Sequence, residues 1–132
     1  MIPQRLRILF SEDDPDTREM ICILLDEEGI DVSCPDSAEH ALDLARLERF
    51  DAYVLDNWMP DMSGIDLCRG IREFDSKTPV IFYSAAAFDE DKNRALACGA
   101  KAYISKPASI DTLAGAIRSA IQEKDFSATP HH

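Results

Sequence analysis

Residues 52–64 read AYVLDNWMPDMSG, and this stretch decides the fold. Its first four residues are apolar, which is typical of a central strand buried on both faces of a parallel sheet. Asp56 follows this run at once, and an acid in that place has little structural purpose. Pro60 and Gly64 then indicate a loop that leads into a helix. In an open α/β sheet, ligands bind beyond the carboxyl ends of the strands, which is where such a loop lies.

Apolar runs and helical patterns alternate five times along the chain, and no linker rich in proline or glycine separates them. This alternation is typical of βαβ units and predicts an α/β fold with a parallel sheet. Strands are expected at residues 6–11, 31–34, 52–56, 79–84 and 101–105. Helices are expected from residue 15 to near residue 29, and at residues 37–48, 65–71, 89–98 and 110–121. The prediction is one domain over residues 1–125 and a disordered tail at 126–132, whose final histidine pair suggests an affinity-tag remnant.

The composition of the 132-residue chain is that of a globular protein, with 45% hydrophobic residues and a net charge of −11. Such an acidic surface repels nucleic acid and anionic membranes, so we expect direct binding to neither. Met1 to Arg7 has no apolar stretch after its charges and does not resemble a signal peptide. The longest purely apolar run, Met20 to Leu25, is too short to span a bilayer. A cytoplasmic location is therefore expected.

The four cysteines are scattered along the chain and show no CxxC spacing; they are Cys22, Cys34, Cys68 and Cys98. Their positions favour buried, reduced thiols in a cytosolic protein. His40 is the only histidine outside the tail. This disfavours a histidine metal site and a histidine-based catalytic triad.

Three acidic side chains are predicted to meet at the carboxyl edge of the sheet. Glu12 and Asp13 follow the first strand, and Asp56 follows the third. Two unit charges about 4 Å apart repel by roughly 4 kcal/mol at an effective dielectric constant near 20. Bringing these acids together is therefore costly unless a cation lies among them, and Mg²⁺ prefers such oxygen ligands. A solvated acidic turn is the alternative for Glu12 and Asp13, whereas Asp14 is best explained as the N-cap of a helix.

A serine and a lysine end the last two strands at the same edge. Ser84 closes the fourth strand, and Lys106 follows the fifth and precedes Pro107. Alone, a Lys-Pro pair is typical of a turn, and Ser84 of an ordinary strand end. Near the carboxylates, however, an ammonium offsets part of their charge and can hold a phosphoryl oxygen. The combined set of groups suits a divalent cation and a phosphoryl group.

From about residue 5 to residue 122, the chain resembles the receiver domain of two-component response regulators. The resemblance rests on four motifs that occur in the right order and at the right spacings. They are ILFSEDD at 8–14, LDNWMPDMSG at 55–64, PVIFYSA at 79–85 and GAKAYISKP at 99–107. The resemblance implies a flavodoxin-like, doubly wound fold, with a five-stranded parallel sheet of order 2-1-3-4-5 and five helices in three layers.

The resemblance also implies a role for each acid of the site. Asp56 would be the phosphoacceptor and would receive a phosphoryl group from a phosphohistidine of a sensor histidine kinase or a histidine phosphotransfer protein. The cofactor would be Mg²⁺ (or Mn²⁺). Asp13 and Asp56 would bind it directly, Glu12 through water, and Trp58 through its backbone carbonyl. Trp58 is a large residue at a position where the family varies and where side-chain size affects access to the site.

The remaining residues of the site would hold and report the phosphoryl group. Lys106, with a cis peptide bond to Pro107, and Ser84 would bind its oxygens, and Tyr103 would turn inward behind Ser84. The face made by the helix at 89–98, the strand after it and the last helix would then change and bind an unknown downstream protein. The chain would be a signalling switch and not an enzyme, because it would assist only its own phosphorylation and dephosphorylation.

Three alternatives remain open from the sequence. A phosphatase of the haloacid dehalogenase type also uses an aspartate nucleophile, but it needs a second acid where this chain has Trp58. A flavodoxin-like FMN carrier needs a phosphate cradle after the first strand, where Glu12 and Asp13 would repel phosphate. The third alternative is a receiver-like protein-interaction module that is never phosphorylated.

Overall fold

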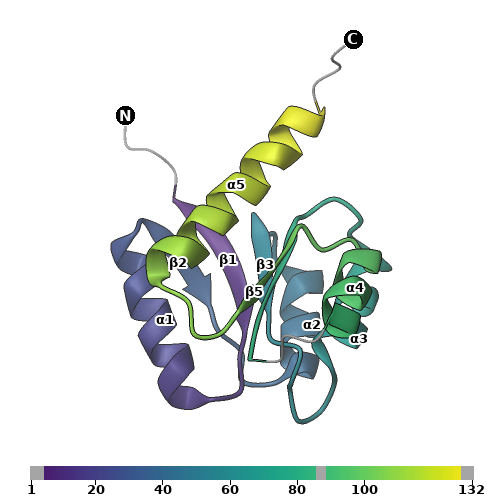
Figure 1. Cartoon of the computed structure of the whole chain (residues 1–132), viewed down its shortest axis with the longest axis horizontal. Helices are drawn as coiled ribbons and strands as arrows, with labels where there is room; N and C mark the ends of the chain where they lie inside the picture. Colours follow the sequence, from purple (N-terminus) through teal and green to yellow (C-terminus); the bar gives the residue numbers. More distant parts are fainter. Residues whose placement is uncertain (1–4, 86–88, 129–132) are drawn as a thin grey trace.

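The chain folds as a five-stranded parallel sheet between two layers of helices (Figure 1). The computed structural model describes residues 5–85 and 89–128. The strands are β1 (Leu6–Ser11), β2 (Ile30–Ser33), β3 (Ala52–Leu55), β4 (Val80–Ser84) and β5 (Ala102–Ser105). The helices are α1 (Pro15–Glu27), α2 (Ala38–Leu47), α3 (Gly64–Arg72), α4 (Asp89–Ala97) and α5 (Ile110–Ala128). The strand order is β2-β1-β3-β4-β5, which confirms the doubly wound flavodoxin-like fold predicted from the sequence.

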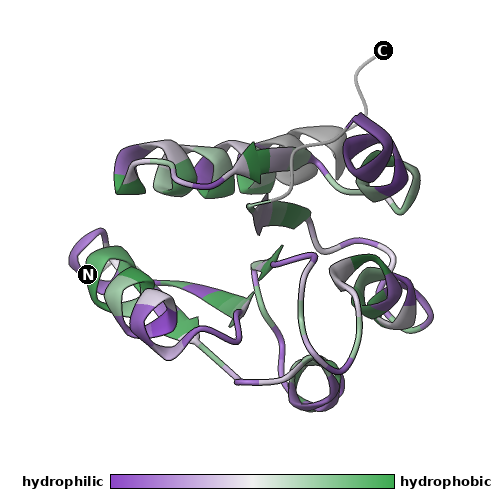
Figure 2. Cartoon of the chain, turned by 60° about the horizontal axis from the view of Figure 1, so that its bottom comes forward, coloured by the Kyte–Doolittle hydropathy of each residue, from purple (hydrophilic) through white to green (hydrophobic). Residues whose placement is uncertain are grey.

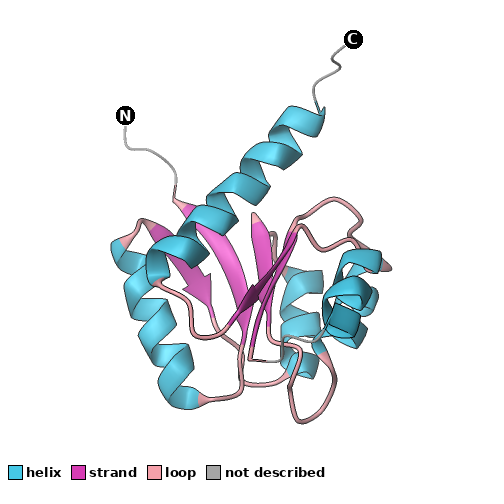
Figure 3. Ribbon diagram, viewed as in Figure 1, coloured by secondary structure: helices cyan, strands magenta, loops and turns pink. Residues whose placement is uncertain are grey.

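Each face of the sheet has its own hydrophobic core, so the molecule has three layers (Figures 2 and 3). On one face, β1 and β3 pack against apolar residues of α1 and α5, among them Leu25 and Ile117. On the other face, side chains of α2, α3 and α4, among them Ala41 and Leu67, form the second core. Burial of such side chains provides most of the stability of a fold of this size.

The central position of β3 follows from its composition. All four residues of Ala52–Leu55 are buried, and β3 pairs with β1 on one side and with β4 on the other. A strand covered on both faces has no polar face, which explains its uninterrupted apolar sequence. The carboxyl end of β3 therefore opens at the middle of the sheet edge, with Asp56 directly after it.

The predicted ends of α1 are confirmed by local geometry. The Asp14 carboxylate accepts a hydrogen bond from the Thr17 backbone N–H at 3.0 Å, and Pro15 occupies the first turn. After the helix, Gly29 adopts a φ of +84°, a left-handed conformation that residues with a Cβ atom avoid. This turn leads directly into β2, so α1 packs back against β2 and the chain reverses within a few residues.

The last helix corrects one boundary of the sequence prediction. Helix α5 runs to Ala128, so the prediction of a disordered tail from residue 126 places the end of the ordered chain too early. No proline or glycine lies between Gly115 and Pro130, and nothing in that interval stops the helix. The predicted tail residues 129–132, with the histidine pair, lie outside the described residues. No helix in the described ranges is long and apolar enough to cross a membrane.

The cysteines differ in part from the prediction of reduced thiols. Cys22 of α1 and Cys34, which follows β2, form a disulfide, so that part of the prediction is wrong. The two side chains meet because α1 packs alongside β2, a contact that cysteine spacing does not reveal. Cys68 and Cys98 are free thiols, as predicted. Burial raises the pKa of the Cys68 thiol to about 11, which keeps it protonated and unreactive at neutral pH.

A partly buried hydrogen-bond network just before β4 centres on Asp75. Its carboxylate accepts hydrogen bonds from the Tyr53 hydroxyl at 2.9 Å, the Thr78 hydroxyl at 2.6 Å and the Thr78 and Lys77 backbone N–H groups at 3.0 Å each. Burial opposes ionisation, but these donors outweigh it and lower the pKa of Asp75 to about 2. The network ties the turn before β4 to β3.

We expect Asp75→Asn to destabilise the fold by roughly 1 to 2 kcal/mol at neutral pH, because a neutral amide is a weaker acceptor for these donors. The folded pKa lies below the unfolded value of about 3.9, so the stabilisation is present above pH 4 and disappears as the pH falls toward 2. Urea unfolding at neutral pH and near pH 3 checks this. A difference between wild type and variant that does not shrink on acidification would contradict it.

Candidate functional site

The carboxyl ends of four strands bring the predicted site residues together. Glu12 and Asp13 follow β1, Asp56 follows β3, Ser84 ends β4 and Lys106 follows β5. The strands are parallel, so all these ends lie at the same edge of the sheet. The site forms because the parallel sheet brings five residues from four separate segments of the chain close together.

Three carboxylates form the acidic part of the site. Glu12, Asp13 and Asp56 each present an oxygen within 4.8 Å of the others. Glu12 is 1% exposed and Asp56 is 5% exposed. Burial raises the pKa of Glu12, against the hydrogen bonds from Lys106 and the Asp14 backbone N–H and the charge of Lys106. The cluster therefore holds negative charge in a place where water can screen it only partly.

Lys106 lies between two of these acids. Its ammonium donates a hydrogen bond to Glu12 and another, of 3.1 Å, to Asp56 Oδ2. Burial would lower the pKa of Lys106, but these two hydrogen bonds and the carboxylate charges raise it, so the side chain stays cationic. The Lys106–Pro107 peptide bond is cis, as the resemblance implies. Three carboxylates and one ammonium leave a net charge of −2 at the site.

Asp56 is held in one orientation by further donors. Asp56 Oδ1 accepts a hydrogen bond from the Ser84 hydroxyl at 3.0 Å and another from the Trp58 backbone N–H at 3.0 Å. Both carboxylate oxygens therefore have partners, with Lys106 on Oδ2. Donors that are fixed around a carboxylate orient its oxygens as nucleophiles. The same donors are already in place to stabilise negative charge that a substrate group brings to the site.

The start of α3 supports the loop after Asp56. A Cβ atom at Gly64 would lie 2.5 Å from the Asp56 carbonyl oxygen, so only glycine lets the helix approach this closely. The Gly64 N–H donates to the Asn57 carbonyl at 3.0 Å, and the Ile65 N–H donates to Asn57 Oδ1 at 3.3 Å. Asn57 is 3% exposed and was not singled out from the sequence. Its place directly after the acceptor candidate is the signal that could have identified it.

Arg18 is a second residue that the sequence reasoning missed. Its guanidinium donates hydrogen bonds to the backbone carbonyls of Glu12, at 3.0 Å, and Asp13, at 3.3 Å. Arg18 lies one helical turn after Asp14, on the side of α1 that faces this loop. It fixes the backbone that carries the two acids, and its charge lies near theirs. Side-chain contacts to backbone carbonyls leave no pattern in a sequence.

Trp58 and Tyr103 lie at the border of the site. Trp58 directs its backbone N–H at Asp56, while 57% of its surface is exposed. Tyr103 of β5 stacks on the Phe82 ring with the centroids 5.7 Å apart. Burial raises the pKa of Tyr103, against a hydrogen bond with Ser84 that lowers it. The Tyr103 ring is thus half-buried next to the serine that contacts Asp56.

The donor set fits a hard divalent cation. Among the residues that the structure describes, no hydrogen bond or ion pair engages the Asp13 carboxylate, although it lies beside two other acids. Mg²⁺ takes one or two carboxylates and keeps several waters, and oxygen is the only ligand atom that these three side chains offer. A dication would balance the net charge of −2 that remains after Lys106.

Fold and site together define a class of protein: a flavodoxin-like α/β domain with an acidic cation site and a lysine around one buried aspartate. Comparison with known families agrees, because residues 8–118 match the response regulator receiver domain. The chain belongs to this family. Membership sets aside the haloacid dehalogenase phosphatase and the FMN carrier as alternatives. Receiver domains are signalling switches, generally not classed as enzymes, and work with histidine kinases and downstream proteins.

Curated relatives and solved structures support the assignment. The chain is 36% identical over 117 residues to the cell cycle response regulator CtrA of Brucella ovis, covering 89% of this chain and 50% of that protein. It thus spans about half the length of the curated relatives it matches. It also resembles the CheY-like receiver domain of Methanospirillum hungatei (TM-score 0.89, 27% identity, 93% of this chain and 98% of that chain).

A further similar structure shows a cation in this kind of site. It is the receiver domain of the sensor histidine kinase PA1611 of Pseudomonas aeruginosa, solved with a magnesium ion coordinated in the active site cleft. The TM-score is 0.82 at 27% identity, with 89% of this chain and 98% of that chain covered. The acidic cluster of this chain fits the receiver-domain Mg²⁺ site.

Proposed function

We propose that the chain is a phosphoacceptor receiver in which Asp56 takes a phosphoryl group from a phosphohistidine in a Mg²⁺-dependent step. The observation that carries the proposal is the environment of Asp56. This carboxylate is 5% exposed, yet Lys106, Ser84 and two further acids surround it within hydrogen-bond or cation-ligand range. A purely structural aspartate has no need of such a set of groups.

The cation would be held by the residues that the sequence suggests. Asp13 and Asp56 would bind it directly, Glu12 through water and Trp58 through its backbone carbonyl. When bound, Mg²⁺ (or Mn²⁺) supplies positive charge that offsets the repulsion between the carboxylates and an incoming phosphoryl group.

The chain's own residues account for the transfer. An Asp56 carboxylate oxygen forms the new bond to phosphorus while the bond from phosphorus to the donor's imidazole nitrogen breaks. The electron pair of that bond stays on the nitrogen. A carboxylate is already ionised at neutral pH, so Asp56 needs no general base. Lys106 would leave its contact with Asp56 Oδ2 and hold a phosphoryl oxygen, and Ser84 would donate to another.

The readout would be a changed surface at α4, β5 and α5. Ser84 ends β4, and its hydrogen-bond partner Tyr103 lies in β5, so movement of Ser84 toward a phosphoryl oxygen alters the packing of the Tyr103 ring. A local electrostatic change would thereby bias an element with two arrangements. Leu96 of α4 is 53% exposed and would offer an apolar contact for a downstream protein.

Intact-mass spectrometry after incubation with acetyl phosphate tests the proposal. We expect the mass of one phosphoryl group to be gained with Mg²⁺ and no gain when EDTA removes the cation. A gain that is equal with EDTA would overturn the cation's role. A lack of gain despite measured Mg²⁺ binding would favour the alternative, a receiver-like interaction module that is not phosphorylated.

We expect Trp58→Ala to shorten the lifetime of the phosphorylated form severalfold. The Trp58 backbone N–H contacts the Asp56 carboxylate and more than half of the surface of Trp58 is exposed, so we expect the indole to limit the approach of water to the phosphoryl group. The decay of the phosphorylated species, followed by mass spectrometry after the donor is removed, measures the effect. Phe74→Ala, which removes another exposed aromatic ring remote from the site, is the control. An unchanged decay rate in Trp58→Ala would refute the role of the indole.

A further inference from the structure

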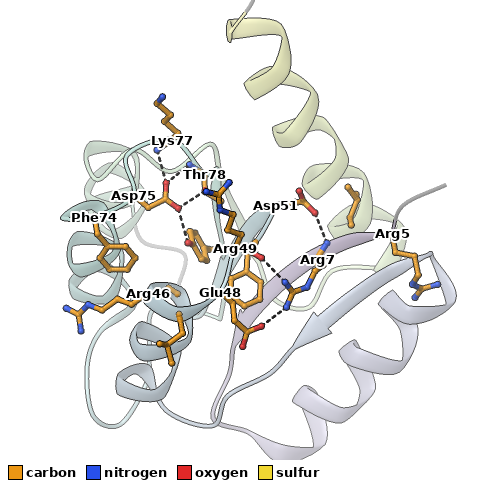
Figure 4. Close-up of a pocket in the computed structure, with 15 residues that line it drawn as sticks. Arg5, Arg7, Arg46, Glu48, Arg49, Asp51, Phe74, Asp75, Lys77 and Thr78 are labelled. Carbon is orange, nitrogen blue, oxygen red and sulfur yellow. Dashed lines mark hydrogen bonds and ion pairs between the residues drawn. The ribbon is translucent and has the colours of Figure 1, made fainter. Parts of the chain in front are cut away.

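A pocket lies at the edge of the sheet opposite the Asp56 site, at the amino ends of β1, β3 and β4 (Figure 4). Its volume is about 840 Å³, within the range of small-molecule sites. Its walls are formed by three segments: the start of β1 with Arg7, the end of α2 with the following residues up to Arg49, and the turn before β4 with Lys77. It is separated from the Asp56 site by the length of the strands, so it is independent of the proposed phosphorylation.

The pocket is basic in an acidic molecule. The chain carries 14 lysines and arginines against 25 acids. Five of these 14 cations line the pocket, against three lining acids; the cations are Arg5, Arg7, Arg46, Arg49 and Lys77. A concentration of one charge sign in a concave place raises the local concentration of the opposite ion.

Three of the five cations are held by neighbours. Arg5 pairs with Asp26 and Asp31, and Arg7 pairs with Glu48 at 2.6 Å. The Arg46 guanidinium lies 5.4 Å from the centre of the Phe74 ring, with Asp43 as a distant partner at 4.0 Å. These contacts fix the walls and leave little charge for a ligand.

Arg49 and Lys77 are different. In the part of the chain that the structure describes, neither the Arg49 guanidinium nor the Lys77 ammonium forms an ion pair or hydrogen bond. The neighbouring Asp75 carboxylate does not neutralise them, because four donors from Tyr53, Thr78 and the Lys77 backbone N–H already occupy it. Figure 4 shows the Arg49 guanidinium beside Thr78, and the Lys77 side chain at the rim of the pocket on the same side, with its ammonium directed outward.

The pocket also has an aromatic surface. Phe50 and Tyr53 are buried in its floor, and Phe74 is 42% exposed at its border. Arg46 lies over one face of the Phe74 ring, and the exposed part of the ring can contact a flat group while unpaired cations elsewhere in the pocket hold an anion. Nucleotides combine a flat aromatic base with a phosphate anion, whereas inorganic polyphosphate offers only the anion.

We propose that this pocket binds a phosphate-bearing anion, with Arg49 and Lys77 as the groups that contact the phosphate. Arg49 offers a planar fork of donors and Lys77 a mobile point charge, two complementary ways to bind phosphate oxygens. Contact between the Phe74 ring and a base would favour a nucleotide over an inorganic polyphosphate.

Titration of the ¹⁵N-labelled wild-type chain with pyrophosphate, and separately with ADP, tests the proposal by amide chemical shifts without Mg²⁺. We expect saturable shifts at residues 46–51 and 74–78, weakened by a rise from about 50 to about 300 mM NaCl. The double variant Arg49→Gln with Lys77→Gln should weaken binding about tenfold or more. Lys101→Gln, which removes an exposed cation outside the pocket, should bind as wild type does.

The two ligands distinguish the sources of the phosphate. Tighter binding of ADP than of pyrophosphate, with the difference lost in Phe74→Ala, assigns the pocket to nucleotides. Equal binding assigns it to inorganic polyphosphate. Shifts that do not saturate, that centre on Asp13 and Lys106, or that persist unchanged in the double variant would overturn the proposal. The spectrum of each variant reports directly whether it is folded.

Discussion

Asp56→Asn should abolish the gain of a phosphoryl group from acetyl phosphate. An amide has no anionic oxygen to attack phosphorus, and no other acid of the site has the same contacts with Ser84 and Lys106. The variant should keep its fold, because asparagine has the same shape and can still accept the hydrogen bonds of Ser84 and Trp58. Intact-mass spectrometry with Mg²⁺ under the same conditions as for wild type is the measurement.

Asp66→Asn is the matched control for this substitution. Asp66 is an exposed acid of α3, and among the described residues its carboxylate pairs only with Arg69, at 3.4 Å. It undergoes the same chemical change outside the site, so it should gain the phosphoryl group as wild type does. Equal phosphorylation of Asp56→Asn and Asp66→Asn would show that the acceptor is another residue.

Lys106→Gln should slow phosphorylation by acetyl phosphate about 10²-fold while it strengthens Mg²⁺ binding. The slowing is expected because the ammonium no longer offsets charge on the incoming phosphoryl group. The stronger Mg²⁺ binding is expected because the net charge of the site changes from −2 to −3 when the lysine is lost. The rate comes from mass spectrometry at saturating Mg²⁺, and the affinity from fluorescence of the single tryptophan, Trp58.

The opposite directions of these two effects separate a role in transfer from a role in folding. A variant that is merely damaged would lose both Mg²⁺ affinity and rate. Lys106→Arg keeps the charge but replaces a compact ammonium by a planar group, so we expect an intermediate rate and wild-type Mg²⁺ affinity. Wild-type rates in both variants would contradict the assignment of Lys106.

Local patterns in the sequence were sufficient to predict the strands, the helices and a parallel sheet, whereas the strand order came from the resemblance to receiver domains. The apolar run at 52–55 identifies β3 as the central strand, and Gly29 after the apolar pattern of α1 marks the turn into β2. The site residues at strand ends were equally predictable, because the carboxyl ends of parallel strands lie at the same edge of a sheet. Asp56, Ser84 and Lys106 meet for that reason.

The residues that sequence reasoning missed act through contacts between distant or backbone groups. Arg18 donates to backbone carbonyls, and Asn57 accepts from the first turn of α3. The Cys22–Cys34 disulfide depends on how α1 lies against β2. The basic pocket escaped notice because Arg49 and Lys77 belong to separate turns that only the folded sheet brings together. None of these contacts produces a periodic pattern or a characteristic residue spacing in the sequence.

Locating the phosphoryl group in the wild-type chain tests most directly whether Asp56 is the phosphoacceptor. Acyl phosphates, but not carboxylates or phosphoesters, are reduced by borohydride, which would convert a phosphorylated aspartate to homoserine. Peptide mass spectrometry after treatment with acetyl phosphate, Mg²⁺ and borohydride then identifies the position. We expect homoserine at position 56 and at no other aspartate. Homoserine at position 13, or a phosphoryl group that resists borohydride, would contradict it.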